Sequence, residues 1–161
     1  MKEQIFMPRI ELFTTDVEYV KLSPTALAPV RGSEQAAGWD LYADFGANEH
    51  ITLAPGEYRK ISTGIAIALP EGTFGAVYPR SGMATKRGLV LANGTGIIDS
   101  DYRGPLIVAL KNTSNEIQII THGERIAQIV VIPYCPIHFC ETDSFGTTAR
   151  GIGGFGSTDT N

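Results

Sequence analysis

The sequence predicts an all-β fold, either a sandwich or a closed barrel, and three observations support this prediction. Short apolar runs recur along most of the chain, and glycine and proline turns separate them. The runs at 106–112 (LIVALKN) and 125–133 (RIAQIVVIP) are rich in branched residues, which is typical of strands. There is no fixed-period repeat and no long amphipathic helix pattern. Periodicity alone does not distinguish a jelly roll from another barrel.

The first half of the chain contributes several of the expected strands. An apolar run at 5–13 contains a proline, which predicts an edge strand, and 16–36 predicts strand and loop. Residues 36–45 (AAGWDLYADF) alternate apolar and polar side chains, which predicts a strand whose acids either lie in solvent or serve a site. Strands continue through 50–69, with a Pro-Gly turn, and through 74–78.

Beyond these strands the sequence predicts one short helix and one weaker strand. The segment SGMATKRG from Ser81 is barely two turns long and ends in Lys86 and Arg87, which is the end that favours cations. Residues 137–141 (IHFCE) form a weaker strand candidate.

Composition excludes several classes of protein. The chain of 161 residues is long enough for one domain, and 43% hydrophobic with 19% charged residues is typical of a soluble globular protein. A net charge of -4 argues against a nucleic-acid surface but leaves room for a small anionic ligand. No apolar run approaches the roughly 20 residues of a membrane span, and we expect no secretory signal. Cys135 and Cys140 are therefore expected to be free thiols in a cytoplasmic protein.

The central stretch GTGIIDSDYRG is the first candidate site. If it forms a hairpin, alternation places Asp99 and Asp101 on one face and Ser100 on the other. Gly94 and Gly96 would allow the backbone to approach a flat ligand closely. The alternative is an ordinary surface turn, since these residue types are common in turns.

The segment PRSG is the candidate phosphate site. An expected strand ends in Arg80, and Ser81 and Gly82 open the short helix. Free amides at a helix start and a planar guanidinium both suit phosphate. The alternative is that Ser81 is a simple helix cap and Arg80 is incidental.

The C-terminal segment 144–161 is expected to be a flexible arm that follows a barrel domain at 1–143. It is dense in glycine, serine and threonine, yet it contains Arg150 and the lone aromatic Phe155 between glycines. Its G-x-G-x-x-G match lacks a strand–helix unit, so we reject a dinucleotide fold. An extended arm of this length would reach roughly 60 Å, against a radius of gyration of about 15 Å for such a domain. We expect it to order over a bound ligand, in its own or a neighbouring subunit.

Five segments in order, AGWDLYA, PRSGMA, GTGIIDSDYRG, GERIAQI and RGIGGFGST, closely resemble the five motifs of the homotrimeric dUTPases. The resemblance runs from about residue 36 to 158. It implies a jelly-roll-like, distorted antiparallel β-barrel with one short helix and a flexible C-terminal arm. It also implies Mg²⁺-dependent hydrolysis of dUTP to dUMP and pyrophosphate, which limits uracil incorporation into DNA and supplies dUMP for dTMP synthesis. The implied assembly is a homotrimer with shared active sites, with no nucleic acid or membrane as partner.

The resemblance also implies roles for individual residues. Asp99 would be the general base, Arg150 would reach the γ-phosphate, and Asp40 would contact Mg²⁺ through water only. Tyr102 would pack on the deoxyribose and exclude a 2′-hydroxyl. The remaining substrate-binding residues would be Arg80, Ser81, Gly82, Asn93, Gly96, Ile97, Ile98, Ile107, Gln128, Phe155, Gly156 and Ser157.

Departures from the family pattern are small. Met83 stands where leucine is commoner, and Asp159 places a negative charge where many members have glycine. Two other functions remain open: a dCTP deaminase-like enzyme of the same fold, and a nucleotide-responsive regulatory protein. The histidines at 50, 122 and 138 are scattered and are expected to be structural, so no all-protein metal cage is predicted.

Overall fold

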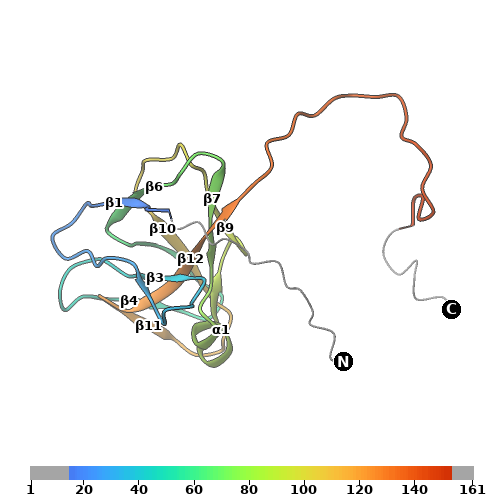
Figure 1. The fold of residues 1–161 in the computed structure, drawn as a ribbon. Coiled ribbons are helices and arrows are strands. Elements are labelled where there is room, and N and C mark those ends of the chain that lie inside the picture. Colours follow the sequence, from blue (N-terminus) through green and yellow to red (C-terminus); the bar gives the residue numbers. More distant parts are fainter. Residues whose placement is uncertain (1–14, 154–161) are drawn as a thin grey trace, which may run out of the picture.

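The computed structural model describes residues 15–153 and consists of antiparallel strands with one short helix in that range (Figure 1). The elements are β1 (Glu18–Lys21), β2 (Val30–Arg31), β3 (Trp39–Tyr42), β4 (His50–Leu53), β5 (Tyr58–Ser62), β6 (Ile65–Ala68), β7 (Thr73–Tyr78), α1 (Ser81–Arg87), β8 (Leu89–Leu91), β9 (Gly96–Ile98), β10 (Ile107–Asn112), β11 (Gln118–Thr121) and β12 (Arg125–Pro133). The expected strands at 106–112 and 125–133 are confirmed as β10 and β12.

The strands form sheets that enclose one core. The largest sheet has the order β2-β3-β12-β7-β9, and a second has the order β5-β10-β8. Two-stranded sheets, β1-β6 and β4-β11, complete the described barrel, and each pairing is antiparallel. The predicted all-β class with one short helix is confirmed.

The core lies between the sheets and is almost entirely aliphatic. Strand β10 shows why: Val108 and Leu110, which are 1% and 0% exposed, alternate with residues that are partly or fully exposed. Asn112 is the polar exception, and its amide nitrogen donates to the carbonyls of Leu53 (2.9 Å) and Glu116 (2.7 Å). This buried polar side chain is therefore satisfied and joins two sheets.

The strand predicted at 36–45 is present as β3, but its acids are not in solvent. Asp40 and Asp44 are 7% and 8% exposed, whereas Trp39 is 43% exposed. Because β3 lies between β2 and β12, both of its edges are covered. Asp44 accepts a hydrogen bond of 2.6 Å from the hydroxyl of Thr25, and the partners of Asp40 are described below.

The prediction of a strand at 137–141 is wrong. Strand β12 ends at Pro133, and residues 134–141 form no strand. Pro133 and Pro136 lack the amide donors that a ladder needs, and Phe139 is 96% exposed because no sheet covers it. The edge strand expected at 5–13 lies outside the described residues.

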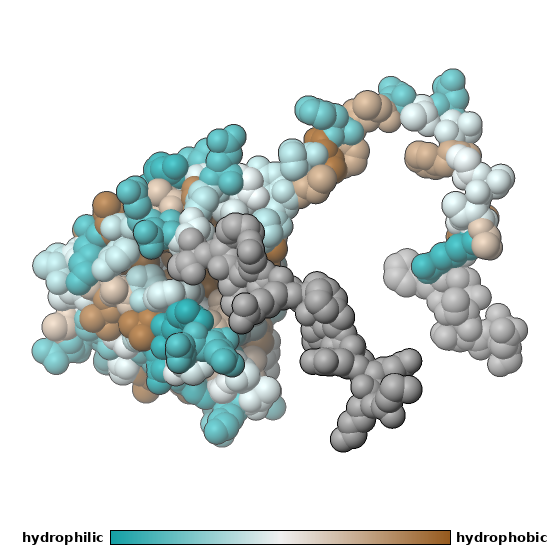
Figure 2. Space-filling model, in the orientation of Figure 1, coloured by the Kyte–Doolittle hydropathy of each residue, from teal (hydrophilic) through white to brown (hydrophobic). Residues whose placement is uncertain are grey.

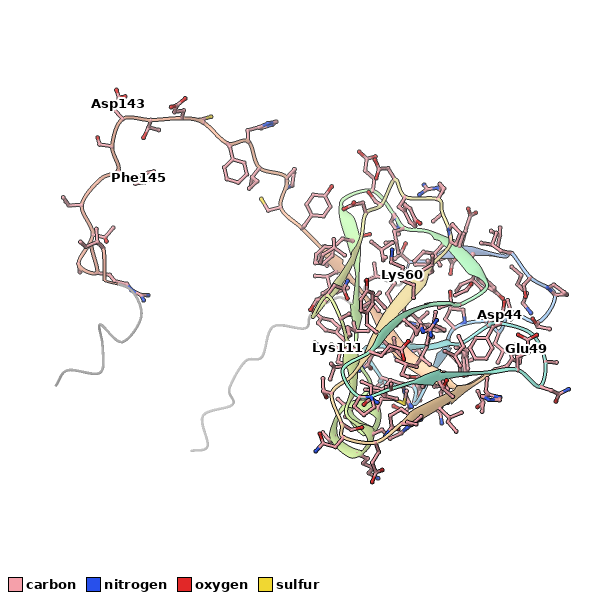
Figure 3. The ribbon with its side chains drawn as sticks, turned by 180° about the vertical axis from the view of Figure 1, so that it is seen from behind. Asp44, Glu49, Lys60, Lys111, Asp143 and Phe145 are labelled. Atoms are coloured by element: carbon pink, nitrogen blue, oxygen red, sulfur yellow. The ribbon has the colours of Figure 1, made fainter. Side chains whose placement is uncertain are left out.

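The chain leaves the barrel after Pro133 as an extended segment. Residues 134–152 are exposed, and Figure 2 shows them as mixed hydrophilic and hydrophobic side chains standing clear of the barrel. Asp143 and Phe145 lie far out on this segment (Figure 3). The boundary at 143/144 stays a prediction. No helix in residues 15–153 has the length and apolar character needed to cross a membrane.

Candidate active site

Four of the five motif segments lie on or directly after strands of the five-stranded sheet. Asp40 lies on β3, Gln128 on β12, Arg80 just beyond β7, and Asp99 just beyond β9. Gln128 is paired with Asp40 on one side and with Tyr78 on the other. The residues of motifs one, two and four therefore meet at one level of the sheet.

The carboxylate of Asp40 is the centre of this group. Its Oδ1 accepts a hydrogen bond of 2.7 Å from Nε of Arg80, and its Oδ2 accepts one of 3.2 Å from Nη1 of Arg125. The two guanidiniums compensate the buried charge. Each guanidinium has five N–H donors, so most donors remain for an anion. Sequence reasoning named Arg125, together with Arg103, only as an alternative to Arg150 for the arginine role, although the place of Arg125 in the GERIAQI segment was a signal.

A bulge in β12 explains how Arg125 reaches this group. The register pairs Arg125 with Tyr42 and Gln128 with Asp40, and it shifts between Arg125 and Ala127. In a regular strand, residues three apart point to opposite faces. The extra residue of the bulge returns Arg125 and Gln128 to the same face.

Gln128 is held in place by its neighbours. Its Nε2 donates a hydrogen bond of 3.1 Å to the carbonyl of Pro79, directly before Arg80. A Cβ atom on Gly38 would lie 2.6 Å from Oε1 of Gln128, so this position needs glycine for the observed rotamer. The amide of Gln128 thus links β12 to the phosphate candidate segment.

The start of α1 differs from the simple cap that the sequence left open. Arg80 occupies the N-cap position, and no side chain caps the helix. Ser81 and Gly82 are the first helical residues, and both are exposed. The first amides of a helix have no intrahelical acceptor. The amides of Ser81 and Gly82, directly after Arg80, therefore have no acceptor within the helix.

The central stretch is not a hairpin. Strand β8 pairs with β10, whereas β9 pairs with β7, so residues 92–95 connect two sheets. Beyond β9, the amide of Tyr102 donates to the carbonyl of Asp99 (3.2 Å) and closes a turn. Strand alternation therefore does not apply, and Asp99, Ser100 and Asp101 all line one cleft of about 860 Å³.

The strand before this turn presents its backbone. Among residues 15–153, β9 is the last strand of its sheet, so one of its edges has no ladder partner within that range. Ile97 is 58% exposed, whereas Ile98 packs against the core and can offer only main-chain groups. Asn93 is exposed in the turn that leads to Gly96.

The ring of Tyr102 has a defined orientation. Its hydroxyl donates to the carbonyl of Pro105 (3.1 Å), and a Cβ atom on Gly104 would lie 2.4 Å from that hydroxyl oxygen. The ring therefore lies over Gly104, where a larger residue would displace it. Tyr102 is 43% exposed and accessible to a ligand.

The other expected site residues lie on other elements or on the extended segment. Ile107 begins β10 in the three-stranded sheet and is 48% exposed. Arg150 is exposed on the extended segment, and its Nε donates to the carbonyl of Gly153 (3.0 Å). Phe155, Gly156 and Ser157 lie outside the described residues.

Fold and site together define a class: an antiparallel β-barrel with a basic, anion-facing group at one level of a sheet and an aspartate-lined cleft. The dUTPase family model matches residues 25–159. The chain is 45% identical over 143 residues to the deoxyuridine 5'-triphosphate nucleotidohydrolase of Desulfitobacterium hafniense, which covers 88% of this chain and 93% of that protein. The chain belongs to the dUTPase family.

Solved structures agree with this membership. A Staphylococcus bacteriophage 80alpha dUTPase mutant with dUpNHpp superposes with a TM-score of 0.80, at 30% identity, over 89% of this chain and 98% of that chain. A dUTPase mutant from phage phi11 of S. aureus, described with a structural Mg(II) ion, has a TM-score of 0.72 at 27% identity, over 83% of this chain and 100% of that chain.

Proposed function

We infer that this chain is a dUTP diphosphatase, which hydrolyses dUTP to dUMP and pyrophosphate. Family membership and the 45% identity to a deoxyuridine 5'-triphosphate nucleotidohydrolase carry the activity. The structural observation that supports it best is the Asp40 carboxylate, which holds Arg80 and Arg125 beside Gln128. Such a group suits a polyphosphate, since guanidiniums bind phosphate oxygens in pairs.

The triphosphate lies on the group around Asp40. Arg80 and the amides of Ser81 and Gly82 contact phosphate oxygens, and the side-chain amide of Gln128 donates to them from the neighbouring strand. These donors are held by the sheet and by the pairing with Asp40, so little ordering is needed when the anion binds.

The nucleoside lies on the edge of β9 that has no ladder partner within residues 15–153. Main-chain groups of Gly96, Ile97 and Ile98, with Asn93, hydrogen-bond to the uracil edge. Main-chain donors and acceptors cannot exchange places, so the base with the complementary pattern is preferred. The ring of Tyr102 packs on the deoxyribose and leaves no room for a 2′-hydroxyl.

Asp99 orients the attacking water. Its carboxylate accepts a hydrogen bond from the water and takes up the proton as the new bond to the α-phosphorus forms. The bond from that phosphorus to the bridging oxygen breaks, and pyrophosphate leaves with the electron pair. Alignment of the water with the leaving oxygen provides much of the acceleration.

The residues near Asp40 fit a magnesium ion that arrives with the triphosphate. Within residues 15–153, no group of three or more His, Cys, Asp or Glu side chains could hold a metal. Mg²⁺ prefers oxygen ligands and keeps several waters. Both oxygens of Asp40 already accept from arginines, but a carboxylate has about four acceptor positions, so it can still hold a metal-bound water. When bound, the ion neutralises phosphate charge.

The active site is shared within a homotrimer and is closed by the arm. Arg150 contacts the γ-phosphate, Phe155 stacks on uracil, and Gly156 and Ser157 cover the phosphates. The role of Ile107 in substrate binding stays a prediction from the sequence. The free, exposed thiols of Cys135 and Cys140 agree with a reducing compartment, and we propose the cytoplasm.

A magnesium-dependent assay with dUTP, dTTP, dCTP and UTP tests this function. We expect pyrophosphate and dUMP from dUTP and little turnover of the other three nucleotides. Ammonia released from dCTP would instead identify the deaminase of the same fold. Tight nucleotide binding without turnover would favour the regulatory alternative.

A further inference from the structure

The last turn of α1 is anchored to the segment before β12 by one arginine. Arg87 donates through Nη1 to Oε1 of Glu124, through Nε to Oε1 of Gln118 (3.0 Å) and through Nη2 to the carbonyl of Ile119. The side chains of Arg87 and Glu124 are only 30% and 23% exposed. The guanidinium is thus committed to protein acceptors and is unavailable to a ligand.

Glu124 in turn stabilises the turn that leads into β12. Its Oε2 accepts a hydrogen bond of 3.1 Å from the amide of Thr121, and its backbone carbonyl accepts one of 2.8 Å from the amide of Ala43. Arg125 follows directly. The carboxylate of Glu124 therefore helps to hold the turn directly before Arg125.

The pair connects the two anion-facing segments of the proposed site. Ser81 and Gly82 open α1, and Arg87 ends it about 9 Å from Ser81, at 1.5 Å of rise per residue. A helix this short moves as one unit, so an anchor at its end also sets the position of its start. Arg125 lies at the other end of the connection. Neither Arg87 nor Glu124 needs to touch the substrate to affect it.

We propose that the Arg87–Glu124 pair is a positioning element that sets the spacing between the Arg80–Gly82 segment and Arg125, and thereby the affinity for the β- and γ-phosphates. The inference rests on the proposed function. A positioning role differs from a purely stabilising ion pair in its consequence: loss of the Arg87–Glu124 pair weakens triphosphate binding selectively. A nucleoside monophosphate has no β- or γ-phosphate and is insensitive to that spacing.

The test compares two ligands by calorimetric titration with Mg²⁺ present: a non-hydrolysable dUTP analogue and dUMP. Glu124→Gln and Arg87→Lys are each expected to weaken analogue binding roughly 3- to 30-fold, with dUMP affinity within about twofold of wild type. The double variant is expected to bind the analogue no more weakly than the single variant with the larger loss of affinity. The two changes break the same connection, so their effects do not add. Glu57→Gln is the matched control, because it makes the same change in another arginine–glutamate ion pair. That pair joins Glu57, directly before β5, to Arg59 within β5 (2.6 Å).

Two results would overturn the proposal: unchanged analogue binding in both variants, or an equal loss for analogue and dUMP. Thermal unfolding is measured for each variant, and Glu124→Asp, which keeps the charge but shortens the reach, decides the matter if Glu124→Gln does not fold. The proposed function is judged separately by the wild-type protein. An active wild type whose variants bind normally contradicts only the positioning role.

Discussion

Asp99 and Arg80 lie at opposite ends of the ladder that joins β7 to β9. The antiparallel register pairs Gly75 with Ile98 and Val77 with Gly96, so Asp99 continues past one end while Arg80 continues past the other. The distance along the strand direction from the level of Asp99 to Arg80 is about six extended residues, or roughly 20 Å. A base and a phosphate ligand that serve one triphosphate must lie closer than this, so we expect each site to take Asp99 and Arg80 from different chains.

Mixing two inactive variants tests the shared site. Asp99→Asn and Arg80→Ala should each be inactive alone. When the two are unfolded and refolded together in equal amounts, about one site in four should combine an intact Asp99 with an intact Arg80 from random assortment of chains. The measurement is dUTP turnover of the mixture relative to wild type.

The companion measurement is mass by light scattering, where we expect about 52 kDa, or three chains of 17.3 kDa. Inactivity of the refolded mixture, or full activity in a monomer, would contradict the shared site.

The turn after β9 makes a second prediction, on the general base. Asp99→Asn should fold, bind the dUTP analogue and lose about 10²–10⁴-fold in kcat, because the amide can hold a water but cannot take its proton. Asp101→Asn is the control, since it makes the same change in the same turn and cleft. Turnover of Asp99→Asn within threefold of wild type would remove Asp99 from this role.

The arm makes a third prediction. A chain that ends before Arg150 should keep its assembly and its unfolding temperature, since residues 134–152 are exposed and contribute little to the core. It should lose most of its turnover. A catalytic arginine contributes on the order of 10³-fold or more in other phosphoryl-transfer enzymes, and base stacking contributes about 1–3 kcal/mol.

A spectroscopic companion uses Phe155→Trp, which keeps an aromatic ring. Its fluorescence should change on adding the dUTP analogue with Mg²⁺, and change less with dUMP. A truncated protein that hydrolyses dUTP at nearly the wild-type rate would make the arm a bystander and move the arginine role to Arg125 or Arg103.

Gly38 makes a fourth prediction. Gly38→Ala should leave stability within about 0.5 kcal/mol, because the atom that it meets is the mobile end of a side chain, Oε1 of Gln128. The displaced amide should lose its bond to the carbonyl of Pro79, and the KM for dUTP should rise. Gly32→Ala is the control, because a Cβ there meets nothing within 4 Å. An unchanged KM would show that the placement of Gln128 does not matter for binding.

Some elements were predictable because their pattern is local. The alternation of buried and exposed residues in β10 and the branched run of β12 are properties of a few neighbouring residues, and both strands are present. The candidate at 137–141 had a similar pattern and failed, because a strand also needs a partner and its preceding prolines lack donors. The pattern around Asp40 identified a strand but not the burial of its acids, which depends on strands on both sides.

The sequence by itself determined the all-β class, the short helix and, through the order of five motifs, the family. Only the tertiary structure decided how those motifs are combined. A bulge set by the pairing with β3 places Arg125 and Gln128 on one face, whereas unbroken alternation would separate them. The ladder between β7 and β9 holds Asp99 away from Arg80. Register between strands distant in the chain is fixed by pairing and packing, which no local pattern of side chains encodes.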